Sequence, residues 1–504
     1  MTNEKITIIG AGISGLYSAW RLIEAGHDPA SLTVLEATDR IGGRLWSLKM
    51  QPDSTLPAEL GGMFFNDQQP LVYGLCSRVL DLPKETVEPR PDFAWLRATR
   101  FKVAQFADPK IQPFNLAPDE QGLSYYQLLD LACTRIAPEI KNLWPQNPDG
   151  SREETLGYLK RHEFDGRPLW RWGFWNLLSR VISHEAWLAL RGMISTYEML
   201  SNWNAFDAMV SIVVEQSGKW YRLTHGYQGL PEALAEAVEK SGAAIHRRHV
   251  LRRIETAGDR LRLVVHADGR DREFESGRVI LAIPRLPLTR VIEASPALRG
   301  GELALQARAV EGVPACKIFL TFDKPWWRDV PDGPGKIADG TYGVSHTDLP
   351  MRQCYYIGVD KGSGQALMLA SYADTDAVSF WRALAPDSGR GFQLESDLGD
   401  VALTEIRREL SEMHGVDVPR PTSGRFIDWS PWPYGGGWHA WLPGWKSWEQ
   451  AAAMCAPVPG VSLHICGESY STAQGWSEGA LQSAEDMLQR CFSLAAPDWL
   501  DPAS

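Results

Sequence analysis

A glycine-rich turn close to the start of the chain constrains the fold more tightly than any other feature of the sequence. Residues 6–9 are apolar, and the pattern G-x-G-x-x-G follows them at Gly10, Gly12 and Gly15. Residues 16–23 then carry apolar side chains at helical spacing, so the order is strand, tight turn, helix. Gly10 permits the turn, Gly12 lets the backbone approach a pyrophosphate, and Gly15 lets the helix pack close to the strand. Because a helix N-terminus attracts anions, this segment predicts a dinucleotide site in a Rossmann-like fold.

A carboxylate follows at the spacing that such a site requires. Glu36 comes directly after a second apolar run, residues 32–35. This is about the twenty-residue spacing at which a carboxylate accepts hydrogen bonds from an adenosine ribose. Glu36 would repel a 2′-phosphate on that ribose. The glycine motif alone is also compatible with an ordinary glycine turn, so the prediction depends on other segments of the chain.

The segment Arg40-Ile41-Gly42-Gly43-Arg44 supports the dinucleotide interpretation. With this segment the chain resembles the flavin-containing amine oxidase superfamily, in which R-x-G-G-R lies over the FAD diphosphate and its last arginine pairs with phosphate. Arg44 matches that arginine, and a solvated surface charge is the alternative interpretation. The resemblance implies that the cofactor is FAD.

The C-terminal segment CGESYSTAQGWSEGALQSAE is the second strong signal. It follows a short strand at residues 464–466 and opens a helix near Glu478, which presents another helix N-terminus to an anion. In the amine oxidases this segment contacts the second phosphate and the ribitol. Gly467, Glu468, Trp476 and Ala480 match that pattern, and the resemblance places Trp476 on an aromatic wall that faces the flavin beside the substrate. A plain core position for Trp476 is the alternative, since the chain has 21 tryptophans.

Lys317 begins an apolar strand, residues 317–322, which is followed by Lys324-Pro325-Trp326-Trp327. A buried ammonium must find partners or lose its proton, so a lysine at this place suggests a chemical role. A lysine with a buried stem and a hydrated ammonium is the alternative. In the amine oxidases a lysine ahead of a strand that ends in P-[FW]-W holds a water against flavin N5 and assists the reaction of reduced flavin with oxygen. Lys317 matches that lysine.

The resemblance extends the predicted cofactor site over several loops. Its members are Gly10, Gly12, Ile13, Ser14, Gly15, Glu36, Ala37, Arg40, Gly42, Gly43, Arg44, Gly61, Gly62, Met63, Phe64, Val250, Gly467, Glu468, Gly475, Trp476 and Ala480.

Further segments indicate the branch of the superfamily. Residues 347–350, Thr-Asp-Leu-Pro, are followed by Tyr355-Tyr356, and this resembles the L-amino acid oxidases, whose second tyrosine here donates to the substrate carboxylate. The match assigns that role to Tyr356. Residues 173–180, 226–231 and 435–441 are also similar to bacterial members of this group, so the resemblance covers nearly the whole chain.

One position departs from that group. In the L-amino acid oxidases an L-G-x-M-R segment supplies an arginine that binds the substrate carboxylate through two parallel hydrogen bonds, whereas this chain has Phe64 after Met63. The loss of a buried charge-assisted pair weakens binding by ~2 to 5 kcal/mol. Either another arginine replaces it, with Arg97, Arg100 and Arg352 as candidates, or the substrate carries an ester, an amide or no acyl group.

The substrate pocket is expected to be large and aromatic. Trp476 and Trp438 would favour an uncharged amine, because desolvation lowers the pKa of an ammonium group; no dedicated base is then required. His439 and His225 are candidates for acid–base residues, with a structural role as the alternative. Trp170, Trp172 and Trp175 are too close in sequence for one face of one helix, so some of them line an entrance or pack in the core. With Phe64 in place of arginine, an apolar or aromatic substrate side chain is favoured.

Charge and cysteine usage exclude several classes of partner. The formal net charge of −11 argues against nucleic acid and anionic membrane surfaces. No apolar run reaches the roughly 18 residues that cross a bilayer, and the first residues do not resemble a signal peptide, so we expect a cytoplasmic protein. The seven cysteines are scattered, which predicts reduced, mostly buried thiols and no metal site. Relatives are commonly homodimers, so we expect a homodimer as well.

The chain is long enough for two or three domains. We expect a mixed α/β fold in which a Rossmann-like FAD-binding domain (1–66, 223–312 and 455–494) is interleaved with the others. A mixed-sheet substrate-binding domain (67–115 and 313–454) and a helical domain (116–222) complete the predicted fold.

The resemblance implies an FAD-dependent oxidative deamination of an L-amino acid or a close derivative. The products are an imine, then a keto compound, ammonia and hydrogen peroxide, with oxygen as the acceptor. One alternative is an amine oxidase whose substrate lacks a free carboxylate. Another is a flavin monooxygenase that decarboxylates an amino acid to an amide. A flavoprotein without enzymatic activity and a nicotinamide dehydrogenase are disfavoured, because they leave Lys317 or the C-terminal flavin segment unexplained.

Overall fold

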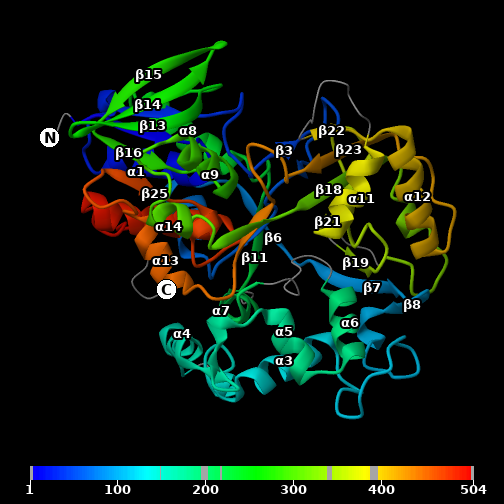
Figure 1. Cartoon of the computed structure of the whole chain (residues 1–504). Coiled ribbons are helices and arrows are strands. Elements are labelled where there is room, and N and C mark those ends of the chain that lie inside the picture. The colour runs from blue at the N-terminus through cyan, green and yellow to red at the C-terminus, as the bar shows by residue number, and fades with distance from the viewer. Residues whose placement is uncertain are drawn as a thin grey trace.

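The computed structural model describes residues 4–147, 149–194, 203–215, 218–337, 343–385 and 395–500. Its first part is a five-stranded parallel sheet in the order β12-β2-β1-β16-β25 (Figure 1). The strands are β1 (Ile6–Ile9), β2 (Leu32–Leu35), β12 (Ala244–His246), β16 (Arg278–Leu281) and β25 (Leu463–Ile465). All four neighbouring pairs are parallel, and residues 6–9 of β1 and 279–281 of β16 are buried, as expected for a sheet that is covered on both faces.

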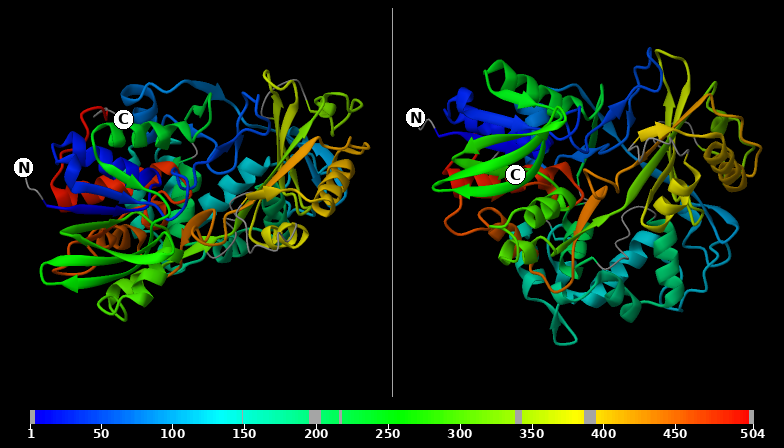
Figure 2. Two further views of the ribbon diagram at one scale, coloured as in Figure 1. Left: turned by 90° about the horizontal axis from the view of Figure 1, so that it is seen from above. Right: turned by 45° about the horizontal axis from the view of Figure 1, so that its top comes forward.

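Distant segments of the chain assemble this part. Helix α1 (Ile13–Glu24) packs against α8 (Gly229–Lys240) and against α14 (Ser477–Phe492). Figure 2 shows the first strands and the last helix side by side, in blue and red. A buried ion pair also joins the two ends, because the Arg21 guanidinium donates two hydrogen bonds of 3.0 Å to Glu485. The interleaved Rossmann-like arrangement is thus present.

The second part is a mixed eight-stranded sheet in the order β22-β23-β18-β21-β20-β19-β7-β8. The strands are β7 (Arg90–Leu96), β8 (Thr99–Lys102), β18 (Ala315–Phe322), β19 (Gly343–Thr347), β20 (Gln353–Val359), β21 (Ala366–Asp374), β22 (Glu395–Asp397) and β23 (Ser423–Asp428). Only the β7–β19 pair is parallel among these described strands. Helices α11 (Asp376–Leu384) and α12 (Asp400–His414) contribute Trp381 and Leu410 to the core on one face. The predicted mixed α/β fold is confirmed.

The third part consists of helices. They are α3 (Tyr125–Ile136), α4 (Arg152–Arg161), α5 (Phe174–Val181), α6 (His184–Met193) and α7 (Ala205–Val210). Ser124 and Ser151 each form a capping box at the start of a helix, which satisfies N–H groups that lack intrahelical partners. The helices enclose their own apolar core around Leu128, Leu178 and Leu190, and in Figure 1 they lie below the other two parts.

The described residues form further strands and helices. The strands are β3 (Ser47–Leu48), β4 (Ala58–Glu59), β5 (Phe65–Asn66), β6 (Lys84–Val87), β9 (Glu163–Phe164), β10 (Arg167–Pro168), β11 (Trp220–Leu223), β13 (Val250–Ala257), β14 (Arg260–Ala267), β15 (Arg270–Ser276), β17 (Val310–Val313) and β24 (Trp438–Trp441). The helices are α2 (Pro70–Gly74), α9 (Arg285–Ala294), α10 (Glu302–Gln306) and α13 (Ser447–Met454). All seven cysteines are free thiols, and six are buried. Within the described ranges, no helix has the length and apolar character to span a bilayer.

Candidate active site

A cavity of about 920 Å³ lies where the three parts meet. Most of the predicted cofactor residues line it: Gly10, Gly12, Ile13, Ser14, Glu36, Ala37, Gly42, Gly43, Arg44, Gly61, Gly62, Met63, Phe64, Val250, Gly467, Glu468, Gly475, Trp476 and Ala480. Gly15 and Arg40 do not line the cavity. The predicted catalytic Lys317 and the predicted substrate contact Trp438 also line it. Residues more than 400 positions apart in the sequence therefore share one pocket.

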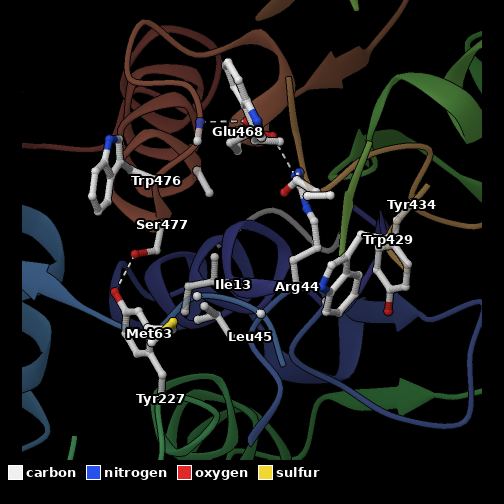
Figure 3. Close-up of a pocket in the computed structure, with 18 of the residues that line it drawn as sticks. Ile13, Arg44, Leu45, Met63, Tyr227, Trp429, Tyr434, Glu468, Trp476 and Ser477 are labelled. Carbon is white, nitrogen blue, oxygen red and sulfur yellow. Dashed lines mark hydrogen bonds and ion pairs between the residues drawn. The ribbon is translucent and has the colours of Figure 1, made fainter. Parts of the chain in front are cut away.

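The glycine turn has the shape that the sequence predicted. Gly10 has a φ of +104°, and a Cβ atom on it would lie 2.5 Å from the Ala282 oxygen. A Cβ atom on Gly15 would overlap the Gly10 carbonyl oxygen. Gly15 therefore acts through the packing of α1 on the turn. Gly12 and Ile13 line the cavity, and Figure 3 shows Ile13 in its wall.

Glu36 lies at the end of β2 and is held by backbone groups. Its Oε2 accepts a hydrogen bond of 2.8 Å from the Ala11 N–H, and its Oε1 accepts one of 2.8 Å from the Thr38 N–H. The carboxylate lines the cavity and is 8% exposed. It is thereby oriented beside the glycine turn, as a ribose contact would require.

The two arginines of the R-x-G-G-R segment make different contacts. Arg40 packs over the Trp46 ring at 4.2 Å and donates hydrogen bonds to the Ile41 carbonyl and the Tyr434 hydroxyl. Arg40 does not itself line the cavity but supports two residues that do, Gly43 and Tyr434, so direct binding of the cofactor by Arg40 stays a prediction. Arg44 lines the cavity.

Arg44, Glu468 and His439 form a buried charged cluster. The Arg44 Nη2 donates to Glu468 Oε2 at 2.6 Å, as Figure 3 shows. Glu468 Oε1 accepts from the His439 N–H at 2.9 Å and from the Gly475 N–H at 2.8 Å. Burial alone would raise the pKa of Glu468, but Arg44 and His439 hold it well below its usual range. The cluster thus positions a guanidinium at the cavity wall, where a diphosphate would be bound.

The two histidine candidates lie elsewhere. His439 is fully buried, does not line the cavity, and places its Nδ1 2.9 Å from Glu468 Oε2. Burial lowers its pKa. His225 does not line the cavity either. The structural alternative for both histidines is favoured.

The C-terminal loop and α14 provide the opposite wall. Trp476 is the N-cap residue of α14, and no side chain caps this helix end. Ser477 Oγ and the Tyr227 hydroxyl are 2.5 Å apart, and this pair ties the helix start to the residue 226–231 segment (Figure 3). Helix α14 therefore directs its first turn toward the cavity, as the pattern of an anion site requires.

Lys317 is 3% exposed, and its ammonium has partners. Its Nζ donates to the Glu59 carbonyl oxygen at 2.8 Å and to the Gly61 carbonyl oxygen, and it lies 4.7 Å from the centre of the Tyr372 ring. Burial lowers its pKa to about 7, although the Glu59 carboxylate acts in the opposite direction. Lys317 can therefore gain or lose a proton near neutral pH in a buried part of the cavity wall.

Glu59 is a residue that the sequence analysis missed. Its carboxylate accepts hydrogen bonds from Ser47 Oγ at 2.7 Å and from the Tyr227 N–H at 2.8 Å. Burial raises its pKa to about 7. Its place two residues before Gly61 was a usable signal, since a carboxylate in an apolar segment needs partners.

The tyrosine prediction is corrected by one residue. Tyr356 does not line the cavity; it is fully buried on the other face of the sheet, with its hydroxyl 2.7 Å from His414 Nε2 and 2.9 Å from Ser345 Oγ. Tyr355 lines the cavity instead. Successive side chains of a strand point to opposite faces, so Tyr355 and Tyr356 cannot share one face.

Aromatic side chains form the part of the cavity wall where the sequence analysis predicts the substrate. Phe64 lies 6.3 Å from Tyr355 between ring centroids, and Trp220 lies 5.5 Å from Trp476. Trp170, Trp172 and Trp175 do not line the cavity and pack against the helical core, so they do not form an entrance. Trp220 and Tyr372 were missed because isolated aromatic residues in strands are usually core residues.

None of the three arginines proposed to replace the lost guanidinium lines the cavity. Arg97 pairs with Glu185 at 2.6 Å, Arg100 donates to the Met413 carbonyl oxygen at 2.6 Å, and Arg352 donates to the Arg191 carbonyl oxygen at 2.8 Å. Among the described residues that line the cavity, the lysine and arginine side chains are Arg44, Arg90 and Lys317. Arg90 is exposed and pairs with Glu88.

Comparison with known proteins identifies a family model and several relatives that match nearly the whole chain. The family model described as "Flavin containing amine oxidoreductase" matches residues 13–487. The chain is 28% identical to aplysianin-A of Aplysia kurodai, over 97% of this chain and 90% of that protein. It is 27% identical to the putative L-amino-acid oxidase YobN of Bacillus subtilis, over 95% of this chain and 93% of that protein.

Solved structures show the same fold. A redesigned putrescine oxidase aligns with a TM-score of 0.69 at 18% identity, over 97% of this chain and 99% of that chain. A cyclohexylamine oxidase from Brevibacterium oxydans aligns with a TM-score of 0.67 at 18% identity, over 96% and 97%.

Proposed function

The chain belongs to the family of flavin containing amine oxidoreductases, and from this premise we propose that it oxidises a neutral amine with an apolar or aromatic skeleton and no free carboxylate. It is an oxidoreductase, and its cofactor is FAD. The single observation that carries the proposed substrate class is Phe64 in the cavity wall, at the position where the L-amino acid oxidases have their carboxylate-binding arginine.

The residues of the cavity fit the cofactor. The Gly12 backbone and the start of α1 would hold one phosphate, Arg44 and the start of α14 would hold the diphosphate from the other side, and Glu36 would hold the ribose. When bound, FAD takes up the two electrons of the C–N oxidation and passes them to oxygen. The substrate is thereby converted to an imine, which water hydrolyses to a carbonyl compound and ammonia, while oxygen leaves as hydrogen peroxide.

The chain itself positions and desolvates the amine. Phe64, Tyr355 and Trp476 surround the substrate end with aromatic surface, which disfavours an ammonium and selects the neutral amine. The charged form of Lys317 carries a proton on Nζ that the neutral form lacks. We assign to Lys317 the proton transfer that accompanies the reduction of oxygen.

A free carboxylate would have no buried guanidinium to pair with at Phe64. Loss of such a pair weakens binding by ~2 to 5 kcal/mol. Amines, amides and esters do not incur this loss of binding energy. This supports the proposal that the enzyme prefers them to free L-amino acids.

An L-amino acid is the second candidate substrate. Several relatives are named L-amino-acid oxidases, and Arg90 reaches the cavity from the start of β7. Arg90 would then bind the carboxylate in exchange for Glu88. The variant Arg90→Leu separates the candidates, since it would abolish oxidation of the free acid and spare the amide.

The experiment that tests the proposal is peroxide release from the purified holoenzyme with a matched panel. The panel contains L-amino acids, their D-enantiomers, their amides and esters, and the corresponding decarboxylated amines, with the same side chains in every form. Amides or simple amines as the best substrates support the proposal, and free L-acids as the best substrates refute it. Carbon dioxide and an amide product with little peroxide would identify the decarboxylating monooxygenase instead. Sedimentation and fractionation test the predicted homodimer and cytoplasmic location.

A further inference from the structure

A buried glutamate belongs to the same backbone segment that holds the ammonium of Lys317. The Lys317 Nζ donates to the carbonyl oxygen of Glu59 at 2.8 Å and to that of Gly61. Glu59 is 8% exposed and does not line the cavity. Any part that its carboxylate takes in the reaction must therefore act through a neighbouring residue.

The Glu59 carboxylate joins this segment to two others. Its Oε2 accepts a hydrogen bond of 2.7 Å from Ser47 Oγ on β3, and its Oε1 accepts one of 2.8 Å from the Tyr227 N–H. Ser47 also lies opposite Glu59 in the antiparallel pairing of β3 with β4. The Tyr227 hydroxyl in turn contacts Ser477 Oγ at the start of α14 (Figure 3). The carbonyl oxygen that Lys317 uses is thus fixed by strand pairing and by the carboxylate of the same residue.

The groups around the Lys317 ammonium come from neighbouring strands. In the sheet, Lys317 lies between Tyr372 of β21 and Ile427 of β23. The Tyr372 ring centre is 4.7 Å from Nζ, and Ile427 is apolar and buried. Glu59 of β4 acts on the charge of Lys317, and Arg222 of β11 acts on the charge of Glu59. Of these groups Glu59 is the carboxylic acid, and its ionised form favours the charged form of Lys317.

We propose that Glu59 is a positioning residue for Lys317 in the reduction of oxygen: its backbone carbonyl orients the ammonium, and its carboxylate keeps that ammonium protonated. This inference rests on the proposed function, which assigns the proton transfer to Lys317. Oxygen takes up two electrons and two protons to become hydrogen peroxide. The anionic reduced cofactor supplies both electrons and one proton. The Lys317 ammonium supplies the other proton, and solvent then returns a proton to the neutral amine.

The variant Glu59→Gln removes the charge and keeps a side chain of the same size. The FAD of the purified holoenzyme is reduced with stoichiometric dithionite in the absence of oxygen and of any amine, and its reoxidation by oxygen is followed by absorbance across a range of pH. We expect the pH midpoint of the reoxidation rate to fall by about one unit, which is the effect of one nearby opposite charge. The rate at about pH 8 should then be roughly tenfold lower, and it should recover toward the wild-type value at about pH 5 to 6. An unchanged midpoint, or a loss that is equal at every pH, would refute the role of Glu59.

Glu120→Gln is the matched control for loss of a buried carboxylate. Glu120 is 1% exposed and accepts hydrogen bonds from Ser183 Oγ at 2.6 Å and from the Ser183 N–H at 2.7 Å. It belongs to the helical part and does not line the cavity. Glu120→Gln should leave the pH midpoint of reoxidation unchanged. A shift equal to that of Glu59→Gln would show a general effect of the lost charge and overturn the inference.

The double variant Glu59→Gln with Lys317→Met tests whether Glu59 acts through the lysine. If it does, adding Glu59→Gln to Lys317→Met should change the reoxidation rate by less than roughly twofold, because the two residues form one unit. A further tenfold loss in the double variant would show that Glu59 acts independently of Lys317.

A titration of the cofactor-free protein tests the charge effect without any reaction. Lysine labelled with ¹³C at Cε is incorporated, and the NMR signal of Lys317 is assigned by its absence in Lys317→Met. Glu59→Gln should lower the titration midpoint of this signal by about one pH unit, whereas Glu120→Gln should leave it in place. An unmoved midpoint in Glu59→Gln would overturn the inference.

These measurements separate failure of the inference from failure of the proposed function, since neither reduction by dithionite nor the titration requires an amine substrate. If no amine releases peroxide, the proposed substrate class fails, yet reoxidation and titration should still show the effect of Glu59. If Lys317→Met reoxidises as fast as the wild type, the proton transfer assigned to Lys317 is wrong, and the inference is wrong with it. If Lys317→Met reoxidises slowly and Glu59→Gln behaves as the wild type, the inference alone is wrong.

Discussion

The variant Phe64→Arg tests most directly why this cavity would reject a free carboxylate. Phe64 lies in the cavity wall 6.3 Å from Tyr355, between the buried residues Met63 and Phe65. An arginine at this position directs its stem along the same aromatic surface and its guanidinium toward the substrate end. A carboxylate would then be bound through two parallel hydrogen bonds.

The expected change follows from the energy of such a pair. A contribution of ~2 to 5 kcal/mol corresponds to a factor of roughly 30 to several thousand, because 1.4 kcal/mol is a factor of ten. We therefore expect Phe64→Arg to raise the ratio of kcat/KM for the free L-acid to that for its amide by at least about thirtyfold. Desolvation of the guanidinium places the expected value toward the lower end.

The assay is peroxide release with an acid and amide pair that share one side chain. Phe64→Leu is the matched control, since it removes the ring without adding charge and should leave the ratio near the wild-type value. The flavin absorption spectrum of each variant shows that the cofactor is bound. A wild-type enzyme that already prefers the free acid, or a Phe64→Arg variant with an unchanged ratio, would refute the reasoning.

Three further predictions concern the surrounding residues. The pKa of Lys317 is lowered to about 7 in the folded protein from an ordinary value of 10.5. Between pH 7 and 10.5 the unfolded chain therefore binds a proton that the folded protein has lost. The free energy of unfolding should then rise with pH above about 7. Denaturant unfolding at several pH values should show that Lys317→Met removes this rise, and an unchanged slope would contradict it. Glu468→Leu should leave Arg44 uncompensated in the cofactor-free protein and lower its stability by about 3 to 5 kcal/mol, measured by denaturant unfolding. A loss below about 1 kcal/mol would show that the cluster is not the support described above. Tyr356→Phe should lower the free energy of unfolding by about 1 to 3 kcal/mol without a change in KM, whereas Tyr355→Phe should change KM. The reverse pattern in steady-state kinetics would support the prediction from the sequence that Tyr356 binds the substrate.

Much of the cofactor end could be predicted because its signals are local. The spacing of Gly10, Gly12 and Gly15 is set by the backbone of one turn, and a Cβ atom at Gly10 or Gly15 would collide with a neighbouring carbonyl. The same applies to Gly42 and Gly43, whose φ values of +97° and +59° require glycine or strongly favour it. A positive φ is a property of the local backbone, so the glycine pattern records it in the sequence.

The substrate end could be predicted only in part. Phe64 stood out because it differs from the arginine of the resembling group, but the choice between Tyr355 and Tyr356 depends on which face of β20 meets the cavity. A register shift of one residue reverses that face, and an apolar strand buried on both sides shows no alternation from which to read it.

The sequence by itself determined the Rossmann-like turn, the R-x-G-G-R loop, the C-terminal helix start and the resemblance to the flavin amine oxidases, because each depends on residues that are close in the chain. Only the tertiary structure showed that the Glu59 carbonyl accepts a hydrogen bond from Lys317, that Arg40 does not line the cavity, and that Tyr355 rather than Tyr356 does. Lys317 and Glu59 are distant in sequence, and the packing of the three parts decides which side chains face the shared cavity.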